Sequence, residues 1–215
     1  MKLFIDTANI NDIKQAYEMG IISGATTNPS IIAKEGKKFE DAIAEITNIM
    51  PEGLIFAEVV SLEWEGMVKE GKEISAINER MVVKIPMCAE GLKACSVLSK
   101  MGIRVCVTLM FSEAQAILAI NAGASFVAPF VGRLDDIGWD GLDLVDGIRE
   151  IIDASEKKAQ IVAASARHPI HLTQLAKIGC DITTVPFKVL MQMIDHPLTA
   201  SGLEKFMKDW ESMPK

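Results

Sequence analysis

The chain has 215 residues, of which 49% are hydrophobic and 24% are charged, and its formal net charge is −7 at pH 7. Single α/β barrel domains have about 200–250 residues, and this composition excludes a disordered chain, which would combine low hydrophobicity with high charge. The acidic balance argues against nucleic-acid binding, because such surfaces need clustered positive charge to displace counterions. A phosphorylated ligand would therefore need a local group of arginines.

The hydrophobic segments predict a cytoplasmic protein that does not associate with membranes. Asp6 follows the apolar residues 3–5, where a secretory signal peptide would need a continuous apolar core. No stretch approaches the roughly 18 uncharged apolar residues of a membrane-spanning helix.

Cysteines and histidines are not arranged as metal ligands. The cysteines lie outside C-x-x-C pairs, so we expect buried free thiols in a reducing compartment. They are Cys88, Cys95, Cys106 and Cys180. The histidines are predicted to be polar surface residues, and they are His168, His171 and His196. The sequence thus predicts no metal and no other cofactor.

Eight short runs of apolar and β-branched residues recur along the chain and are predicted to be strands. They cover 2–6, 22–26, 54–60, 81–86, 104–109, 125–130, 160–165 and 181–185. Several of them, such as 161–164, are apolar at successive positions. That pattern is typical of strands buried on both faces, as in a parallel sheet covered by helices.

Segments with helical periodicity lie between these runs. They cover 11–17, 39–49, 63–77, 91–100, 112–121, 143–154, 170–177 and 188–193. The alternation predicts an α/β fold of the (β/α)8 TIM barrel type, with residues 1–215 in one domain. A doubly wound open sheet is the alternative, but no glycine-rich phosphate fingerprint follows the first run.

A further amphipathic helix is predicted at about 196–211, beyond the eighth unit. Phe206 and Trp210 lie one helical turn apart on it. Side chains of this size favour burial, so the helix is expected to pack either on its own barrel or on a neighbouring subunit.

The ends of the predicted strands contain a group of polar and charged residues. In a barrel these ends converge on one face, where catalytic residues collect. The group consists of Asp6, Thr26, Thr27, Asn28, Glu58, Lys84, Thr108, Arg133, Ser165 and Arg167, and the aromatic Phe130 ends the sixth strand shortly before Arg133.

Lys84 is the most informative member, because it lies within the apolar strand 81–86. An unpaired ammonium in a barrel interior is costly, and desolvation favours the neutral amine, which can attack a carbonyl. A Schiff-base lysine is the preferred interpretation, and a structural lysine paired with a buried carboxylate is the alternative. Asp6 and Glu58 could serve proton transfer or could simply neutralise Lys84.

Arg133 and Arg167 have planar guanidinium groups that suit a phosphate, and Ser165 adds a hydroxyl donor. Each arginine alone could instead form a surface salt bridge. Because both lie at neighbouring strand ends, we expect a site for the phosphate end of a sugar phosphate.

These residues lie in motifs that resemble the transaldolase family, and closely its small-subunit branch, which includes the fructose-6-phosphate aldolases. The motifs are Phe4-Ile5-Asp6-Thr7-Ala8, Gly24-Ala25-Thr26-Thr27-Asn28-Pro29-Ser30, Val82-Val83-Lys84-Ile85-Pro86, Ala128-Pro129-Phe130-Val131-Gly132-Arg133 and Ala164-Ser165-Ala166-Arg167. With the strand spacing that continues beyond them, the resemblance covers essentially the whole chain.

The resemblance implies metal-independent class I aldolase chemistry. Lys84 would condense with a ketose carbonyl, and Asp6 would take the C4 hydroxyl proton as the C3–C4 bond breaks. Glu58 and Thr108 would hold the water that relays protons. Thr27 and Asn28 would bind sugar hydroxyls, and the phosphate would be bound by Arg133, Ser165 and Arg167.

Two positions favour a transferase over a simple aldolase within this family. The aldolase branch is similar but has tyrosine at the position of Phe130 and glutamine at that of Glu58. Ala128 departs from the serine of larger transaldolases and removes one hydroxyl contact. We therefore expect a transaldolase acting on sugar phosphates in the pentose phosphate pathway, with fructose-6-phosphate aldolase as the alternative.

Two further expectations concern the oligomeric state and the possibility that the barrel is not catalytic. Members of the small-subunit branch are typically pentamers or decamers, so the resemblance implies a homo-oligomer. A non-catalytic barrel that binds a phosphorylated ligand, with a structural Lys84, is the more remote alternative.

Overall fold

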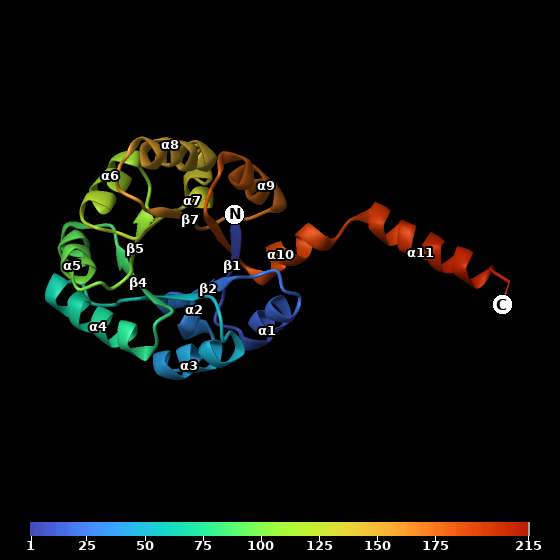
Figure 1. Cartoon of the computed structure of the whole chain (residues 1–215), viewed down its shortest axis with the longest axis horizontal. Coiled ribbons are helices and arrows are strands. Elements are labelled where there is room, and N and C mark those ends of the chain that lie inside the picture. The colour runs from blue at the N-terminus through green and yellow to red at the C-terminus, as the bar shows by residue number, and fades with distance from the viewer. Residues whose placement is uncertain (215) are drawn as a thin grey trace.

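A computed structural model describes residues 1–214 of the chain, and its centre is a closed barrel of eight parallel strands in sequence order (Figure 1). The predicted (β/α)8 architecture is confirmed. The strands are β1 (Lys2–Asp6), β2 (Gly24–Thr26), β3 (Leu54–Glu58), β4 (Met81–Pro86), β5 (Val105–Met110), β6 (Phe126–Pro129), β7 (Gln160–Ala163) and β8 (Ile182–Val185).

Helices surround the strands, apart from the last one, which projects away from the barrel (Figure 1). They are α1 (Ile10–Glu18), α2 (Pro29–Lys34), α3 (Phe39–Ile49), α4 (Trp64–Ile77), α5 (Ala89–Lys100), α6 (Glu113–Asn121), α7 (Val131–Asp135), α8 (Gly141–Ala154), α9 (Pro169–Ile178), α10 (Phe187–Ile194) and α11 (Pro197–Glu211). The short helices α2 and α7 were not predicted, and they lie directly after β2 and β6. Five strands are shorter than predicted, namely those expected at 22–26, 54–60, 125–130, 160–165 and 181–185.

Two apolar layers hold the barrel together. Between strands and helices lie buried aliphatic side chains such as Ile55, Val83 and Leu98. A second cluster fills the barrel interior, where Phe56 makes edge-to-face contacts with Phe4 and Phe126 at centroid distances of 5.6 and 5.0 Å. Because these rings fill the inside of the barrel, they form a floor below the polar residues at the strand ends.

Strand register places chemically different side chains next to one another. Glu58 on β3 pairs with Lys84 on β4, and Pro86 pairs with Thr108 on β5. Between Val107 and Met110 the β5–β6 register shifts, where Leu109 adopts a left-handed φ of 58°. A bulge of this kind re-aims the neighbouring side chains.

The predicted C-terminal helix exists as α11, and it projects away from the barrel (Figure 1). None of its residues is buried, and Phe206 and Trp210 are 69% and 70% exposed. The expectation that α11 packs on its own barrel is therefore wrong. The alternative, a neighbouring subunit, stays open. Within residues 1–214 no helix combines the length and the apolar character needed to cross a bilayer.

The cysteine prediction is correct for three positions and wrong for one. Cys95, Cys106 and Cys180 are buried free thiols, and burial raises the pKa of Cys95 and Cys106 to about 12. Cys88 is exposed. Its position explains the difference, since its Sγ accepts a hydrogen bond from the Gly91 backbone N–H and caps α5 at the barrel surface.

Candidate active site

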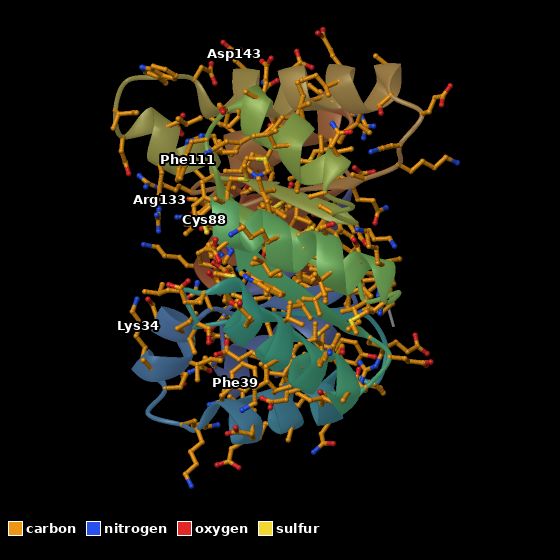
Figure 2. All side chains as sticks on the ribbon, turned by 90° about the vertical axis from the view of Figure 1, so that its left-hand side faces the viewer. Lys34, Phe39, Cys88, Phe111, Arg133 and Asp143 are labelled. Atoms are coloured by element: carbon orange, nitrogen blue, oxygen red, sulfur yellow. The ribbon has the colours of Figure 1, made fainter. Side chains whose placement is uncertain are left out.

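A cavity of about 270 Å³ opens at the carboxyl ends of the strands. Lys34, Cys88 and Arg133, which all follow strand ends, lie along this face at the left of Figure 2. Most of the predicted site residues line the cavity. They are Asp6, Asn28, Lys84, Thr108, Phe130, Arg133, Ser165 and Arg167.

Lys84 lies in the wall of this cavity with only 8% of its side chain exposed. Its Nζ is 3.2 Å from Glu58 Oε2 and donates a hydrogen bond of 3.3 Å to the Thr27 carbonyl. An ammonium has three N–H donors, of which the Thr27 carbonyl takes one, and the Glu58 carboxylate balances its charge. The amine is thus buried and paired, yet it borders the space that a ligand would occupy.

Asp6 is the second ionisable group of the cavity. Burial raises the pKa of its carboxyl, and a hydrogen bond from Thr26 and the charge of Lys84 offset part of that rise. Thr26 Oγ1 donates to Asp6 Oδ1 at 2.6 Å and lies 2.6 Å from Thr184 Oγ1. Because Thr26 has one hydroxyl proton, Thr184 is then the donor to Thr26. A carboxylate with a raised pKa is a stronger base than an ordinary aspartate.

The Thr108 hydroxyl is buried and has no hydrogen-bond partner within residues 1–214. Buried polar groups are nearly always paired, and an exception needs an explanation. Thr108 precedes the bulge at Leu109 and lines the cavity, so its hydroxyl is available to a ligand or to water that enters.

Two predicted residues, Thr27 and Glu58, do not line the central cavity. The Thr27 hydroxyl donates to the Phe56 carbonyl at 3.0 Å, while its own carbonyl accepts from Lys84. Glu58 reaches Lys84 and otherwise borders a hollow beside α3 and α4. The predicted contact between Thr27 and a sugar hydroxyl stays a prediction.

Asn28 links the cavity to α2. Its Oδ1 caps the helix by accepting from the Ile31 backbone N–H at 2.9 Å, and Pro29 occupies the first helical turn. This pairing uses the amide oxygen, which leaves the NH2 group as a donor on the cavity side.

Arg133 extends from α7 over the ring of Phe130, with the guanidinium carbon 4.9 Å from the ring centroid. Phe130 in turn packs against Phe111 at 5.8 Å between centroids. A cation over an aromatic face is attracted to it, so the Phe130 ring, which packs against Phe111 at an angle of 59°, favours this direction of the guanidinium.

Arg167 forms the surface ion pair that the sequence left open as an alternative. Its Nη1 and Nη2 donate to the two carboxylate oxygens of Asp136, the second at 2.6 Å. Both side chains are about half exposed, at 47% and 51%. Their mutual hydrogen bonds raise the pKa of Arg167 and lower that of Asp136. Arg167 still lines the cavity, so the pair lies at its rim.

Ser165 lies between β7 and Arg167 in a left-handed conformation, with φ of 60°. Non-glycine residues adopt this conformation at a cost, and such residues concentrate at functional sites. The Ser165 carbonyl accepts from the Gly132 N–H at 3.2 Å. A Cβ on Gly132 would collide with that carbonyl oxygen and lie 2.6 Å from Arg167 Nε, so α7 packs directly on this loop.

Comparison with known proteins identifies the family of the chain. A family model described as Transaldolase/Fructose-6-phosphate aldolase matches residues 3–215. A probable transaldolase of Clostridium botulinum (strain Eklund 17B / Type B) is 58% identical over 215 residues, covering all of both chains. Probable transaldolases of Geobacter metallireducens and Caldicellulosiruptor saccharolyticus are 54% and 58% identical, over the whole of this chain and 100% and 99% of theirs.

The chain belongs to the transaldolase/fructose-6-phosphate aldolase family.

The structure also places in the site residues for which the sequence analysis proposed no role. Thr26 was included among the strand-end residues without a role, and Thr184 was not considered, although both line the cavity beside Asp6. Asp136 was not considered either. Thr184 could have been found from the alternation of side chains along β8, since it lies one residue before the end of that strand.

The prediction that His171 is a polar surface residue is wrong. His171 is 7% exposed, with Nε2 3.2 Å from Asp135 Oδ2 and Nδ1 accepting from the Arg167 backbone N–H at 3.3 Å. Burial and the neighbouring His168 lower the pKa of His171. The sequence places His171 in the first turn of α9, but only tertiary packing against α7 buries it.

Proposed function

We propose that this protein is a transaldolase, which transfers a dihydroxyacetone unit from a ketose phosphate to an aldose phosphate through a Schiff base on Lys84. The observation that carries the proposal is the buried amine of Lys84, 3.2 Å from Glu58, in the wall of a cavity that also holds Asp6 and two arginines. Family membership supports an enzyme of the aldolase-type transferase kind.

The first half-reaction forms the imine. Glu58 takes a proton from Lys84, and the neutral amine attacks the C2 carbonyl of fructose 6-phosphate. The resulting carbinolamine loses its oxygen as water, with protons supplied through Glu58 and the Thr108 hydroxyl. The short Glu58–Lys84 distance and the unpaired hydroxyl of Thr108 support these roles.

Bond cleavage then depends on Asp6. Its carboxylate takes the C4 hydroxyl proton while the C3–C4 bond breaks, and the bonding electrons move into the iminium nitrogen to give an enamine. Glyceraldehyde 3-phosphate leaves. The raised pKa of Asp6 suits a proton acceptor, and its charge is stabilised by the hydroxyl of Thr26.

Transfer reverses these steps on a second substrate. The enamine carbon attacks the aldehyde of erythrose 4-phosphate, Asp6 returns its proton to the new alkoxide, and water hydrolyses the imine to release sedoheptulose 7-phosphate and Lys84. Thr27 and Asn28 contact the sugar hydroxyls, and Arg133, Ser165 and Arg167 hold the phosphate. The proposed reaction uses no metal or other cofactor. We further propose that the enzyme acts in the cytoplasm, in the pentose phosphate pathway.

Borohydride trapping tests the central claim. Reduction in the presence of fructose 6-phosphate is expected to leave a stable adduct on Lys84, located by peptide mass mapping. Lys84→Met should abolish it, while Lys72→Met on the exposed side of α4 should not. A protein that binds the sugar phosphate but is never modified would instead be a non-catalytic binding barrel.

Acceptor dependence separates transfer from simple cleavage. We expect fructose 6-phosphate turnover to rise strongly when erythrose 4-phosphate is added, because the phenyl ring of Phe130 cannot orient water or donate a proton. Phe130→Tyr should raise the acceptor-free fraction. Equal rates with and without the acceptor would favour a fructose-6-phosphate aldolase that releases free dihydroxyacetone.

The exposed apolar side chains of α11 support a homo-oligomer, a pentamer or a decamer, in which α11 packs on a neighbouring subunit. They include Leu203, Phe206, Met207 and Trp210, each more than half exposed.

A further inference from the structure

The two arginines at the rim of the cavity come from different elements. Arg133 extends from α7, and Arg167 lies in the loop between β7 and α9. A phosphate bound by both would require the loop to keep a fixed position relative to α7, because bidentate recognition depends on the spacing of the donors.

At the start of the loop, after β7, backbone hydrogen bonds hold the loop against α7. The Val131 and Gly132 N–H groups donate to the Ala164 and Ser165 carbonyls at 3.0 and 3.2 Å. These bonds hold the loop residues before Arg167, but none of them reaches the backbone of Arg167 itself.

At Arg167, the contact between the loop and α7 is made through the side chain of His171. The ring Nδ1 accepts from the Arg167 backbone N–H at 3.3 Å, and Nε2 lies 3.2 Å from Asp135 Oδ2. Because Nδ1 is an acceptor here, the ring proton is on Nε2, the nitrogen that faces Asp135. Asp135 is the last residue of α7, two positions after Arg133.

We infer that His171 is a positioning residue for the phosphate end of the site: its neutral ring ties the Arg167 backbone to Asp135 on α7, so that Arg133 and Arg167 keep one spacing. The inference rests on the proposed function for the identity of the phosphate ligand. Asp136 adds a second tie from the same segment, to the Arg167 side chain, but that pair is half exposed and therefore weak.

Protonation breaks this connection. A proton on Nδ1 would point at the Arg167 N–H, so imidazolium cannot accept that hydrogen bond. The charged groups facing the ring are His168 at the N-cap of α9, Asp135, Arg167, and Asp140 at the start of α8. Burial, His168 and Arg167 together outweigh the carboxylates and lower the pKa of His171. The neutral ring, which can accept the bond from Arg167, is therefore favoured, and protonation on acidification would break the tie.

The test compares phosphate affinity and substrate selectivity in the full chain. Inorganic phosphate binding is measured by titration calorimetry at pH 7.5 and 5.5, and KM and kcat are measured for fructose 6-phosphate and for unphosphorylated fructose. His171→Leu removes the acceptor. We expect it to weaken phosphate binding and raise the fructose 6-phosphate KM about three- to tenfold, as for one lost hydrogen bond, with less than a twofold change in kcat/KM for fructose.

His171→Asn provides the conservative rescue, since its amide oxygen can take the place of Nδ1 and does not titrate. Its shorter side chain restores the acceptor for the Arg167 backbone N–H but does not extend as far as Nε2 toward Asp135. It is therefore expected to recover part of the phosphate affinity at pH 7.5 and to lose less affinity at pH 5.5 than the native protein does. Comparing both proteins at each pH removes the contribution of the phosphate's own protonation. This comparison also tests the role of His171 if His171→Leu fails to fold.

His168→Asn is the matched control. It removes the imidazole that lies 3.8 Å from the His171 ring and retains a good helix cap for α9. Within residues 1–214 no hydrogen bond joins the His168 side chain to Asp135 or to the Arg167 backbone. Phosphate affinity at pH 7.5 should be unchanged, and the weakening on acidification should persist and begin at slightly higher pH, because a neighbouring positive charge is gone.

Several results would overturn the inference. They are no measurable phosphate binding by the native protein, native phosphate affinity in His171→Leu, an equal loss with both sugars, or the same acid weakening in His171→Asn as in the native protein. Because phosphate binding does not require the Lys84 imine, these measurements stand even if trapping of Lys84 fails. Conversely, trapping of an adduct on Lys84 does not determine the outcome of the phosphate-binding measurements.

Discussion

At the scale of single residues, the chemistry depends on how a buried carboxyl is kept ionised. Asp6 lies deep in the barrel, where desolvation raises its pKa, and the hydroxyl of Thr26 works in the opposite direction. Thr184 donates to Thr26 in turn, so two neutral side chains support one charge. In the proposed mechanism, the pH range in which Asp6 acts as a base would therefore depend on hydroxyl groups as well as on Lys84.

Thr26→Val should shift the acid limb of the kcat/KM profile to higher pH. Without that hydrogen bond the pKa of Asp6 rises further, so more of the carboxyl is protonated and inactive at a given pH. Thr184→Val should cause a smaller shift in the same direction. Thr183→Val, on the adjacent buried position of β8 but outside the cavity, is the control and should cause none. An unchanged acid limb in Thr26→Val would contradict this role.

Residue types at the strand ends were predictable, but several of their partners were not. Asp6, Lys84 and Thr108 follow from knowing where strands end, because a barrel brings those ends together. The Arg167–Asp136 and His171–Asp135 pairs join positions 31 and 36 residues apart. Such pairs depend on how α7 lies against α9, which periodicity in the sequence does not contain.

At the scale of elements, most boundaries followed from periodicity, while α2 and α7 did not. With six and five residues, these helices are too short to show an apolar repeat. The Asn28–Pro29 step is nonetheless a helix-start signal, since asparagine caps α2 and proline suits its first turn. Both helices follow directly on strands and carry or adjoin cavity residues, so they position the site more than they stabilise the barrel.

Gly132→Ala tests the close packing of α7 on the loop after β7. The added methyl would collide with the Ser165 carbonyl and with Arg167, so the loop must move. We expect the KM for fructose 6-phosphate to rise about tenfold or more, and unfolding to become easier by about 1–3 kcal/mol, as for other overpacked sites. Gly202→Ala on α11, where nothing lies within 4 Å, is the control and should leave KM unchanged. Native KM in Gly132→Ala would contradict the packing argument.

At the scale of the whole molecule, the barrel and α11 differ in character. The strands enclose continuous apolar layers, whereas α11 exposes large apolar side chains, more than is usual for a helix in water. All the residues that line the cavity precede position 187. The catalytic residues proposed here can therefore be assembled within one subunit, and α11 is left for contacts between subunits.

Removing the segment after Asp195 should change assembly more than the cavity. We expect the truncated protein to have a lower mass by sedimentation or light scattering than the full chain, and to keep borohydride trapping on Lys84. The paired substitution Phe206→Ser and Trp210→Ser should have the same effect without shortening the chain. An unchanged mass in both variants would contradict a role for α11 in assembly.

The seam between the first and last strands has a consequence for how the protein is made. Lys2 pairs with Ile182 and Ile5 with Val185, so the ring is completed only when residues 180 positions apart meet. Until β8 has emerged from the ribosome, β1 and β7 each present an unpaired edge, the kind of surface on which nascent chains aggregate. Synthesis of this enzyme therefore includes a long interval in which nearly all of its barrel exists without closure, and chaperones that shield strand edges would act in that interval.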